Sequence, residues 1–201
     1  MIPNLYKTIL KVLVASILLC NVAYAVPEDK LYDVMKVKID KATAVLQNKT
    51  LDIKNKEKEI FALFDSMFDY TLMAQLSLGN QWKLLSDEQK VEFTTHFEKR
   101  LKTAYIDKLY LYTNEAIIVK ELNKLNENRI QIPMHIIGEK ETFEVIYKLY
   151  KTSQNDWLIY DVDILGISII QTYRNQFIGV LQKESFEGLI AKLNKVEAVT
   201  K

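Results

Sequence analysis

The chain has 201 residues, 27 of them basic and 26 acidic, so its formal net charge at pH 7 is +1. This near-neutral balance gives no support to nucleic-acid binding, which needs a basic stripe. The only cysteine, Cys20, lies in the N-terminal segment considered next. The remaining residues therefore have no thiol for disulfides, thiolate metal sites or cysteine catalysis.

Residues 1–25 have the features of a secretory signal peptide. Two lysines precede or enter an apolar run over residues 12–20, and the small residues Ala23 and Ala25 occupy the expected cleavage positions. The run is too short for a spanning helix, although an uncleaved anchor is the alternative. Cleavage removes two of the 27 basic residues and leaves 25 against 26 acidic ones. We expect residues 26–201 to form a single exported domain.

Helical periodicity dominates the first half of the mature chain. Residues 28–48 and 55–68 have apolar side chains at three- and four-residue spacing, and each range predicts an amphipathic helix. Asp69 is positioned to cap a short helix over residues 70–78, which we expect to end at Gly79.

A longer helix is expected after Ser86. Gln89 follows three residues later, and the pair has the form of a capping box. Apolar and aromatic residues then recur at four-residue steps, at Phe93, Phe97, Leu101, Tyr105 and Leu109. This aromatic stripe predicts one buried helix face.

After Tyr112 the apolar period changes from helical to two, which predicts strands. The predicted strands cover residues 116–122, 129–137, 142–151 and 157–165, and helices over 167–183 and 186–195 close the chain. Pro133 predicts an edge strand or a bulge, and short polar connections favour antiparallel pairing. The sequence therefore predicts an α+β fold, with helices packed on one face of a curved antiparallel sheet of about four strands.

One apolar surface is predicted to continue from the last strand onto the following helix. Gly166 separates the period-two pattern from the helical one, and Asp161 and Asp163 are expected on the solvated strand face. The residues expected on the apolar surface are Tyr160, Val162, Ile164, Ile169, Ile170, Tyr173 and Phe177.

Residues with catalytic or metal-binding chemistry form no recognisable site. His96 and His135 have no further ligand at metal spacing, and zinc needs three or four. Asp161 and Asp163 have the spacing for acid–base work, but solvated carboxylates are the commoner explanation. Ser168 lacks the Gly-x-Ser-x-Gly elbow. We therefore expect no enzyme activity, no metal and no cofactor.

The predicted strands and helices present extensive apolar surface. A solid core and a core that encloses a cavity would use the same residues, and periodicity does not distinguish the two. The candidates for the lining of a cavity are Phe64, Phe68, Leu72, Leu76, Phe97, Leu101, Tyr105, Met134, Val145, Tyr147, Leu149, Tyr160, Val162, Ile164, Ile170, Tyr173 and Phe177. Arg174 is placed near the mouth of such a surface, where a guanidinium suits a phosphate or carboxylate. A salt bridge to a neighbouring acid explains Arg174 equally well.

Several segments carry a family resemblance. They are FDYTLMAQLSLGNQW (68–82), LSDEQKVEFTTHFEKRLKTAY (85–105), WLIYD (157–161) and DVDILGISIIQTYRNQF (161–177) followed by LIAKL (189–193). Together they resemble the MlaC family of periplasmic phospholipid carriers, also called toluene-tolerance auxiliary proteins. The resemblance covers most of the mature chain in the right order. It implies a nuclear transport factor 2-like fold with a deep apolar cavity for acyl chains.

The resemblance also implies a place of action and partners. The expected protein is a periplasmic monomer that shuttles phospholipid between an outer-membrane lipoprotein complex and an inner-membrane ABC transporter with its substrate-binding MCE subunit. That traffic would maintain outer-membrane lipid asymmetry, with phospholipid as cargo rather than cofactor. The alternatives are a solid-cored protein-interaction module and an enzyme on the same cone-shaped fold.

Overall fold

The computed structural model describes residues 26–109 and 114–195, and for residues 105–109 it describes the backbone alone. The α-helices are α2 (Leu31–Gln47), α3 (Ile53–Phe64), α4 (Tyr70–Leu78), α5 (Asp87–Leu109), α6 (Ile169–Leu181) and α7 (Phe186–Asn194). Short 3₁₀ segments lie at η1 (Glu28–Lys30), η2 (Asp65–Met67) and η3 (Gly79–Leu84). The strands are β1 (Ala116–Val119), β2 (Asn123–Asn126), β3 (Arg129–Ile137), β4 (Thr142–Lys151), β5 (Trp157–Ile164) and β6 (Ile167–Ser168).

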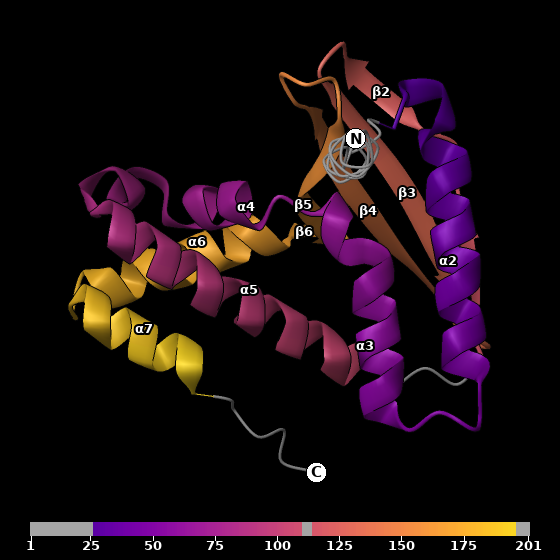
Figure 1. Cartoon of the computed structure of the whole chain (residues 1–201), viewed down its shortest axis with the longest axis horizontal. Coiled ribbons are helices and arrows are strands. Elements are labelled where there is room, and N and C mark those ends of the chain that lie inside the picture. The colour runs from indigo at the N-terminus through magenta and orange to yellow at the C-terminus, as the bar shows by residue number, and fades with distance from the viewer. Residues whose placement is uncertain (1–25, 110–113, 196–201) are drawn as a thin grey trace, which may run out of the picture.

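The strands of the described ranges form one six-stranded antiparallel sheet in the order β1-β3-β4-β5-β6, with β2 also paired to β3. Helix α2 lies along one face of the sheet with α3 beside it (Figure 1). Helices α4 to α7 gather on the other side of the molecule, where α4 and α6 contact β5 (Figure 1). The predicted α+β class with a curved antiparallel sheet is confirmed.

The sheet has two strands more than the sequence predicts. All four residues of β2 are polar or exposed, so no apolar alternation marks it, and only backbone pairing with β3 defines it. Strand β6 has two residues, which is too short for a period to be visible. Its residues lie at the start of the helix that the sequence predicts over residues 167–183.

The predicted helix ends are confirmed where capping chemistry defines them. The Asp69 carboxylate accepts the Leu72 N–H at 2.8 Å, and α4 ends at Gly79. The Gln89 N–H donates to Ser86 Oγ at 3.2 Å, and the Ser86 N–H donates to Gln89 Oε1 at 3.0 Å, which completes the capping box.

Pro133 lies inside β3, which has neighbours on both sides, so the prediction of an edge strand or a bulge at this position is wrong. Its carbonyl accepts the Lys120 N–H at 2.8 Å. The nitrogen of a strand residue faces the same side as its carbonyl, and on that side β1 has ended at Val119 while β2 begins at Asn123. Proline has no N–H to offer the Lys120 carbonyl in return, so the ladder between β1 and β3 ends at this position.

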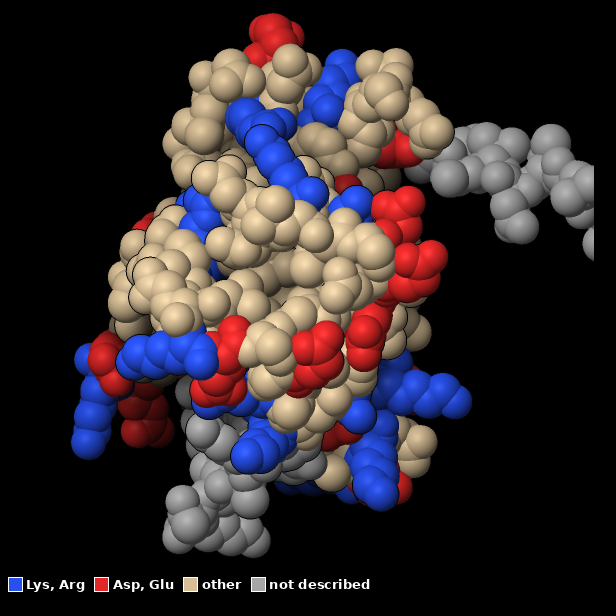
Figure 2. All heavy atoms as spheres, turned by 90° about the vertical axis from the view of Figure 1, so that its left-hand side faces the viewer, with Lys and Arg blue, Asp and Glu red and all other residues tan. Residues whose placement is uncertain are grey.

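The surface carries charges of both signs. Figure 2 looks onto the side formed by α4 to α7, where acidic and basic side chains both border a central uncharged area. This side therefore presents no field of a single sign. Over the described residues, no helix combines the length and the apolar character needed to cross a membrane.

Candidate functional site

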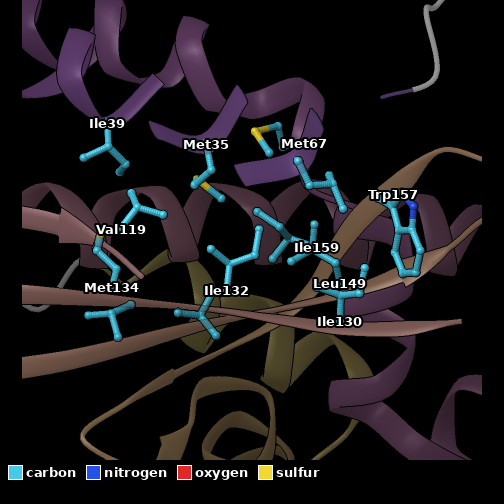
Figure 3. Packing of buried hydrophobic residues seen from close by; sticks show 13 residues of the cluster. Met35, Ile39, Met67, Val119, Ile130, Ile132, Met134, Leu149, Trp157 and Ile159 are labelled. Carbon is cyan, nitrogen blue, oxygen red and sulfur yellow. The ribbon is translucent and has the colours of Figure 1, made fainter. Parts of the chain in front are cut away.

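The first of two apolar clusters, here called the sheet cluster, lies between α2, η2 and one face of the sheet (Figure 3). Its buried members are Leu31, Met35, Ile39, Met67, Val119, Ile130, Ile132, Met134, Val145, Leu149, Trp157, Ile159 and Val162. Val119, Met134 and Val145 are direct partners across three strands. The period-two pattern therefore brings one residue of each of these three strands into the same layer of the cluster.

The second, here called the bundle cluster, lies among helices α4, α5, α6 and α7. Its buried members are Met73, Ala74, Leu78, Phe93, Phe97, Leu101, Ile170, Phe177, Leu189, Ile190 and Leu193. Phe177 meets Phe93 edge to face with ring centroids 5.5 Å apart, and Phe97 meets Tyr173 in the same way at 5.2 Å. Such edge-to-face contacts are a favoured geometry of aromatic pairs.

The two clusters meet at Phe68 and Ile169, which are half-buried and pack against both. Phe68 forms a bridge with Ile159 of β5, and the Asp69 N–H donates to the Ile159 carbonyl at 2.9 Å. Ile169 is the first residue of α6. Apolar surface therefore continues from the sheet into the helices through these two half-buried side chains.

Tyr147 on β4 packs against the sheet cluster and is half-buried. Burial raises the pKa of its phenol to about 12. Within the described ranges its hydroxyl has no hydrogen-bond partner. This hydroxyl is therefore able to hydrogen-bond with water or with a polar group of a ligand.

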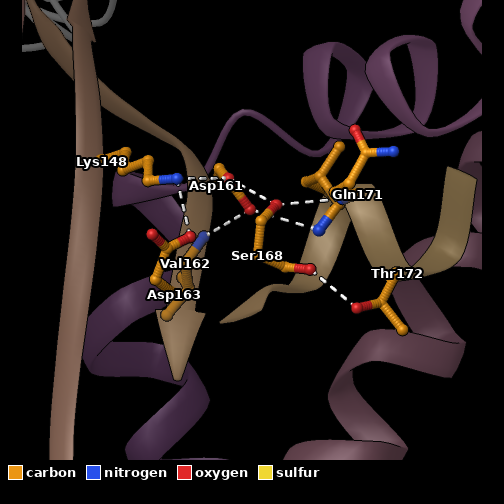
Figure 4. A network of polar contacts seen from close by, with 8 residues as sticks. Lys148, Asp161, Val162, Asp163, Ser168, Gln171 and Thr172 are labelled. Atoms are coloured by element: carbon orange, nitrogen blue, oxygen red, sulfur yellow. Dashed lines mark hydrogen bonds and ion pairs between the residues drawn. The ribbon is translucent and has the colours of Figure 1, made fainter. Parts of the chain in front are cut away.

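A polar network anchors the first turn of α6 to β5 (Figure 4). Asp161, only 6% exposed, accepts hydrogen bonds from Ser168 Oγ at 2.8 Å and from Lys148 Nζ at 3.1 Å. Its other oxygen accepts the N–H groups of Val162 and Ile170 at 2.9 and 3.2 Å.

Lys148 also lies 2.6 Å from Asp163, so it stands between two carboxylates. Burial alone lowers the pKa of Lys148, but the hydrogen bonds to Asp163 and Asp161 outweigh it and raise the pKa. The expectation that Asp161 and Asp163 are solvated is wrong. Both carboxylates hold the lysine, and Asp161 alone also holds the start of α6, which leaves Asp161 no open acceptor for acid–base chemistry.

Arg174 on α6 contacts the C-terminal end of α4. A Cβ atom added to Gly79 would lie 2.7 Å from Arg174 Nη2 and 2.9 Å from its Nε. Gly79 has φ +56° and ψ −124°, a conformation that side-chain-bearing residues avoid. Within the described ranges Arg174 forms no ion pair, so the salt bridge considered for it is not seen. Its guanidinium lies where helix carbonyls gather negative partial charge.

Tyr160 lies on the face opposite the sheet cluster. The β4–β5 pairing shifts there, since Lys148 pairs with Asp161 but Leu149 pairs with Ile159, which leaves Tyr160 as the extra residue of a bulge. Arg129 covers its ring, with the guanidinium carbon 5.0 Å from the ring centroid. The prediction that Tyr160 shares a face with Val162 and Ile164 is therefore wrong.

Comparison with known families identifies the chain. The family model described as MlaC protein matches residues 36–195, which contain most of both clusters. The chain belongs to the MlaC family. A curated relative, the intermembrane phospholipid transport system binding protein MlaC of Haemophilus influenzae, is 26% identical over 122 residues. That match covers 59% of this chain and 57% of the relative, so the chain spans a little over half the length of the curated relative.

A solved structure shares the MlaC fold seen here. It is the phospholipid-binding protein of Ralstonia solanacearum, determined in complex with a phospholipid, and it superposes with a TM-score of 0.69. The two are 22% identical, and the superposition covers 81% of this chain and 94% of that one. At this identity the likeness establishes the fold.

The predicted cavity residues of this chain are divided between the two clusters. In or against the sheet cluster lie Phe64, Met134, Val145, Tyr147, Leu149, Val162 and Ile164, and in or against the bundle cluster lie Leu76, Phe97, Leu101, Ile170, Tyr173 and Phe177. Phe68 contacts both. Leu72 is half-buried on α4 outside the clusters, and the side chain of Tyr105 lies outside the described part of the chain.

Several apolar residues of the site were not assigned to it from the sequence. Met35 of α2 and Met67 of η2 belong to the sheet cluster. Leu31, Met35 and Ile39 recur every four residues, which is the signal that predicts a buried helix face. Met67 also follows Ile60 and Phe64 at helical spacing, but the structure places it in a 3₁₀ segment after α3 has ended. Among the described residues, no three His, Cys, Asp or Glu side chains are placed to hold a metal.

Proposed function

We propose that this MlaC family chain is a periplasmic phospholipid carrier, exported by residues 1–25, and that residues 26–201 form its single lipid-binding domain. The acyl chains would lie at the junction of the sheet and bundle clusters, beside Phe68 and Ile169. The observation that carries this proposal is that Phe68 and Ile169, both half-buried, pack against both clusters. Family membership and the phospholipid-bound fold relative support it.

The energetics of lipid transfer require enclosure. Each methylene is worth about 0.8 kcal/mol, so two acyl chains of about 16 carbons forgo on the order of 20 kcal/mol on leaving a bilayer. An exposed groove cannot compensate this loss, because it leaves the acyl chains in contact with water. Walls on two sides can, and the sheet cluster and bundle cluster offer aliphatic and aromatic groups from both sides.

Two groups suit the polar end of the lipid. The Tyr147 hydroxyl, without a partner in the described residues, can donate to an ester or phosphate oxygen. Arg174 remains the proposed head-group contact, because a guanidinium binds phosphate in a bidentate way and no carboxylate of the described residues engages it. The neighbouring α4 carbonyls attract the same guanidinium, so a purely structural role for Arg174 is the competing explanation.

In this proposal the protein acts as a monomer between two membranes. It would receive or deliver phospholipid at an outer-membrane lipoprotein complex and at an inner-membrane ABC transporter with its MCE subunit. Phospholipid is then a cargo and not a cofactor, and the traffic would maintain outer-membrane lipid asymmetry.

Lipid extraction tests the proposal. Protein purified without detergent should release phospholipid into organic solvent, as detected by mass spectrometry. Ile169→Trp, which adds bulk at the junction, should lower the lipid content several-fold. Ile178→Trp is the matched control, since Ile178 lies on the same helix and is 42% exposed. Absence of lipid from the wild-type protein, with transfer between vesicles also absent, would favour the solid-cored interaction module instead.

Arg174→Ala tests the head-group contact separately. If the guanidinium binds the phosphate, transfer of phospholipid between vesicles should slow while the acyl chains are still extracted with the protein. Unchanged transfer would remove Arg174 from the binding site and leave it with the structural role at Gly79.

A further inference from the structure

The β5–β6 hairpin carries exposed apolar side chains at its tip. Leu165 and Gly166 form the turn, and Ile167 begins β6. Leu165 is 57% exposed and Ile167 is 65% exposed. A Cβ atom added to Gly166 would meet nothing within 4 Å, so the tip projects away from its surroundings. Neither Leu165 nor Ile167 belongs to the clusters assigned above to the lipid.

The backbone of the tip makes its leucine unusual. Leu165 has φ +52° and Gly166 has φ +78°, the pair of positive angles found in type I′ hairpin turns. Such positions favour Asn, Asp or Gly, because a branched side chain is crowded there. The other described non-glycine residues with positive φ are Asn114 and Asn155. The tip therefore holds an apolar side chain where local conformation favours a small polar one, which indicates a role in contact.

Acidic residues lie at the same end of the sheet as the tip. The Leu165 N–H donates to the Glu144 carbonyl at 3.0 Å, so the tip lies beside the start of β4. The connection that leads into β4 carries Glu139 and Glu141, and all three glutamates are exposed. Lys140 is the basic residue of this connection. The imidazole of His135 lies 3.5 Å from the Glu144 carboxylate. Three carboxylates against one ammonium and this imidazole leave an excess of acidic groups at this end of the sheet.

We propose that Leu165 and Ile167 form a docking surface for a partner protein that offers an apolar pocket with a basic rim. The pocket would take the two aliphatic side chains, and the rim would complement Glu139, Glu141 and Glu144. A membrane surface is the less suitable occupant, because anionic lipids attract basic segments and repel carboxylates. The docking surface does not depend on the proposed lipid site, which is formed by different residues at the junction of the two clusters.

Leu165→Asn separates binding from folding. Asparagine tolerates the left-handed conformation, so the variant should unfold at the same or a higher urea concentration than the wild-type protein. Leu125→Asn is the matched control, since Leu125 is 53% exposed on β2, at the opposite end of the sheet. Both variants should contain the same amount of phospholipid as the wild type, so a failure of the lipid proposal and a failure of the docking proposal give different results.

The probe is a photo-crosslinking benzoylphenylalanine placed at position 165 or at position 125 of the full chain in its own cells. Position 165 should yield an adduct with one protein, to be identified by mass spectrometry and then purified. Its Kd for the Leu165→Asn variant should be about tenfold or more weaker than for wild type, the worth of one buried leucine. The Leu125→Asn variant should bind within twofold of wild type, and added salt should weaken binding.

Each other result overturns the proposal. These results are adducts at 165 that match those at 125, no adduct at 165, or an unchanged Kd for Leu165→Asn. An adduct between two copies of the chain would assign the tip to self-association. Binding to vesicles of anionic phospholipid that is lost in Leu165→Asn would assign it to a membrane.

Discussion

The phenolic hydroxyl of Tyr150 on β4 donates a hydrogen bond to Oδ2 of Asp69, with the two oxygens 2.5 Å apart. The other carboxylate oxygen of Asp69 caps α4 through the Leu72 N–H, and its own N–H bonds to Ile159 of β5. One residue therefore joins the first bundle helix to two strands. This joint fixes where the bundle cluster meets the sheet cluster.

Replacing Asp69 should cost more than replacing an ordinary helix cap. Asp69→Ala removes the cap, worth about 1 kcal/mol, and leaves the Tyr150 hydroxyl without its acceptor, worth about 1–2 kcal/mol more. The control is Asp52→Ala, since Asp52 caps α3 through the Asn55 N–H and is exposed. Urea unfolding should show a loss of about 2–3 kcal/mol for Asp69→Ala and about 1 kcal/mol for Asp52→Ala. Equal losses would show that the Tyr150 bond adds nothing.

Alkaline pH should destabilise the fold through tyrosines whose pKa is raised in the folded protein, among them two on β4. The pKa of Tyr150 is raised to about 12, first by burial and then by the Asp69 hydrogen bond, and that of Tyr147 is raised to about 12 by burial. The ordinary tyrosine value is 10.0. The unfolded chain therefore loses these protons at lower pH than the folded protein, and the contribution to stability is full below pH 10 and lost as pH rises toward 12.

Titration of tyrosine absorbance checks this pH dependence. The pKa values of Tyr70 and Tyr173 are also raised, chiefly by burial, so at least four tyrosines should ionise late. Tyr150→Phe should remove one of them and reduce the fall in urea midpoint above pH 10. A wild-type protein whose tyrosines all ionise together near their ordinary pKa would contradict the expectation.

Gly79 and Gly179 should respond to alanine with opposite signs. Gly79→Ala forces a side chain into a left-handed conformation, which costs roughly 1–2 kcal/mol, and drives its Cβ into the Arg174 guanidinium. Gly179 lies inside α6 with nothing within 4 Å of an added Cβ, so Gly179→Ala should stabilise by roughly 1 kcal/mol. Thermal unfolding measures both.

The same experiment in an Arg174→Ala background separates conformational strain from collision. There, Gly79→Ala should lose the collision and keep only the backbone cost. A Gly79→Ala penalty that is the same in both backgrounds would mean that the guanidinium moves aside without cost.

The helix ends could be predicted because their chemistry is local. Ser86 and Gln89 are three residues apart, and Asp69 and Leu72 likewise, so a single chain segment determines each cap. The face of the sheet on which Tyr160 lies could not be predicted. A bulge in β5 inserts one residue and so reverses the alternation that the sequence shows.

Contacts between distant segments were equally hidden from the sequence. Arg174 meets Gly79 across 95 positions, and only the packing of α4 on α6 brings them together. The division of the apolar residues into two clusters that join at Phe68 has the same cause. Periodicity identifies a buried face, but it does not say which other face covers it.

Asp161 should be the costliest of the network carboxylates to neutralise, because it accepts four hydrogen bonds and is buried. Asp161→Asn keeps one acceptor oxygen but loses the negative charge beside Lys148. Asp163 still faces that lysine, so we expect a loss of about 2–3 kcal/mol, below the 3–5 kcal/mol of a fully broken buried pair.

Asp163→Asn is the matched control and should cost about 1 kcal/mol, because Asp161 then remains with Lys148. Hydrogen exchange gives the decisive readout, since Asp161 accepts the Ile170 N–H at the first turn of α6. Exchange at Ile170 and Gln171 should accelerate in Asp161→Asn and stay near wild type in Asp163→Asn. If both variants exchange alike, the anchoring of α6 does not depend on Asp161, and the helix is held by its bundle cluster contacts alone.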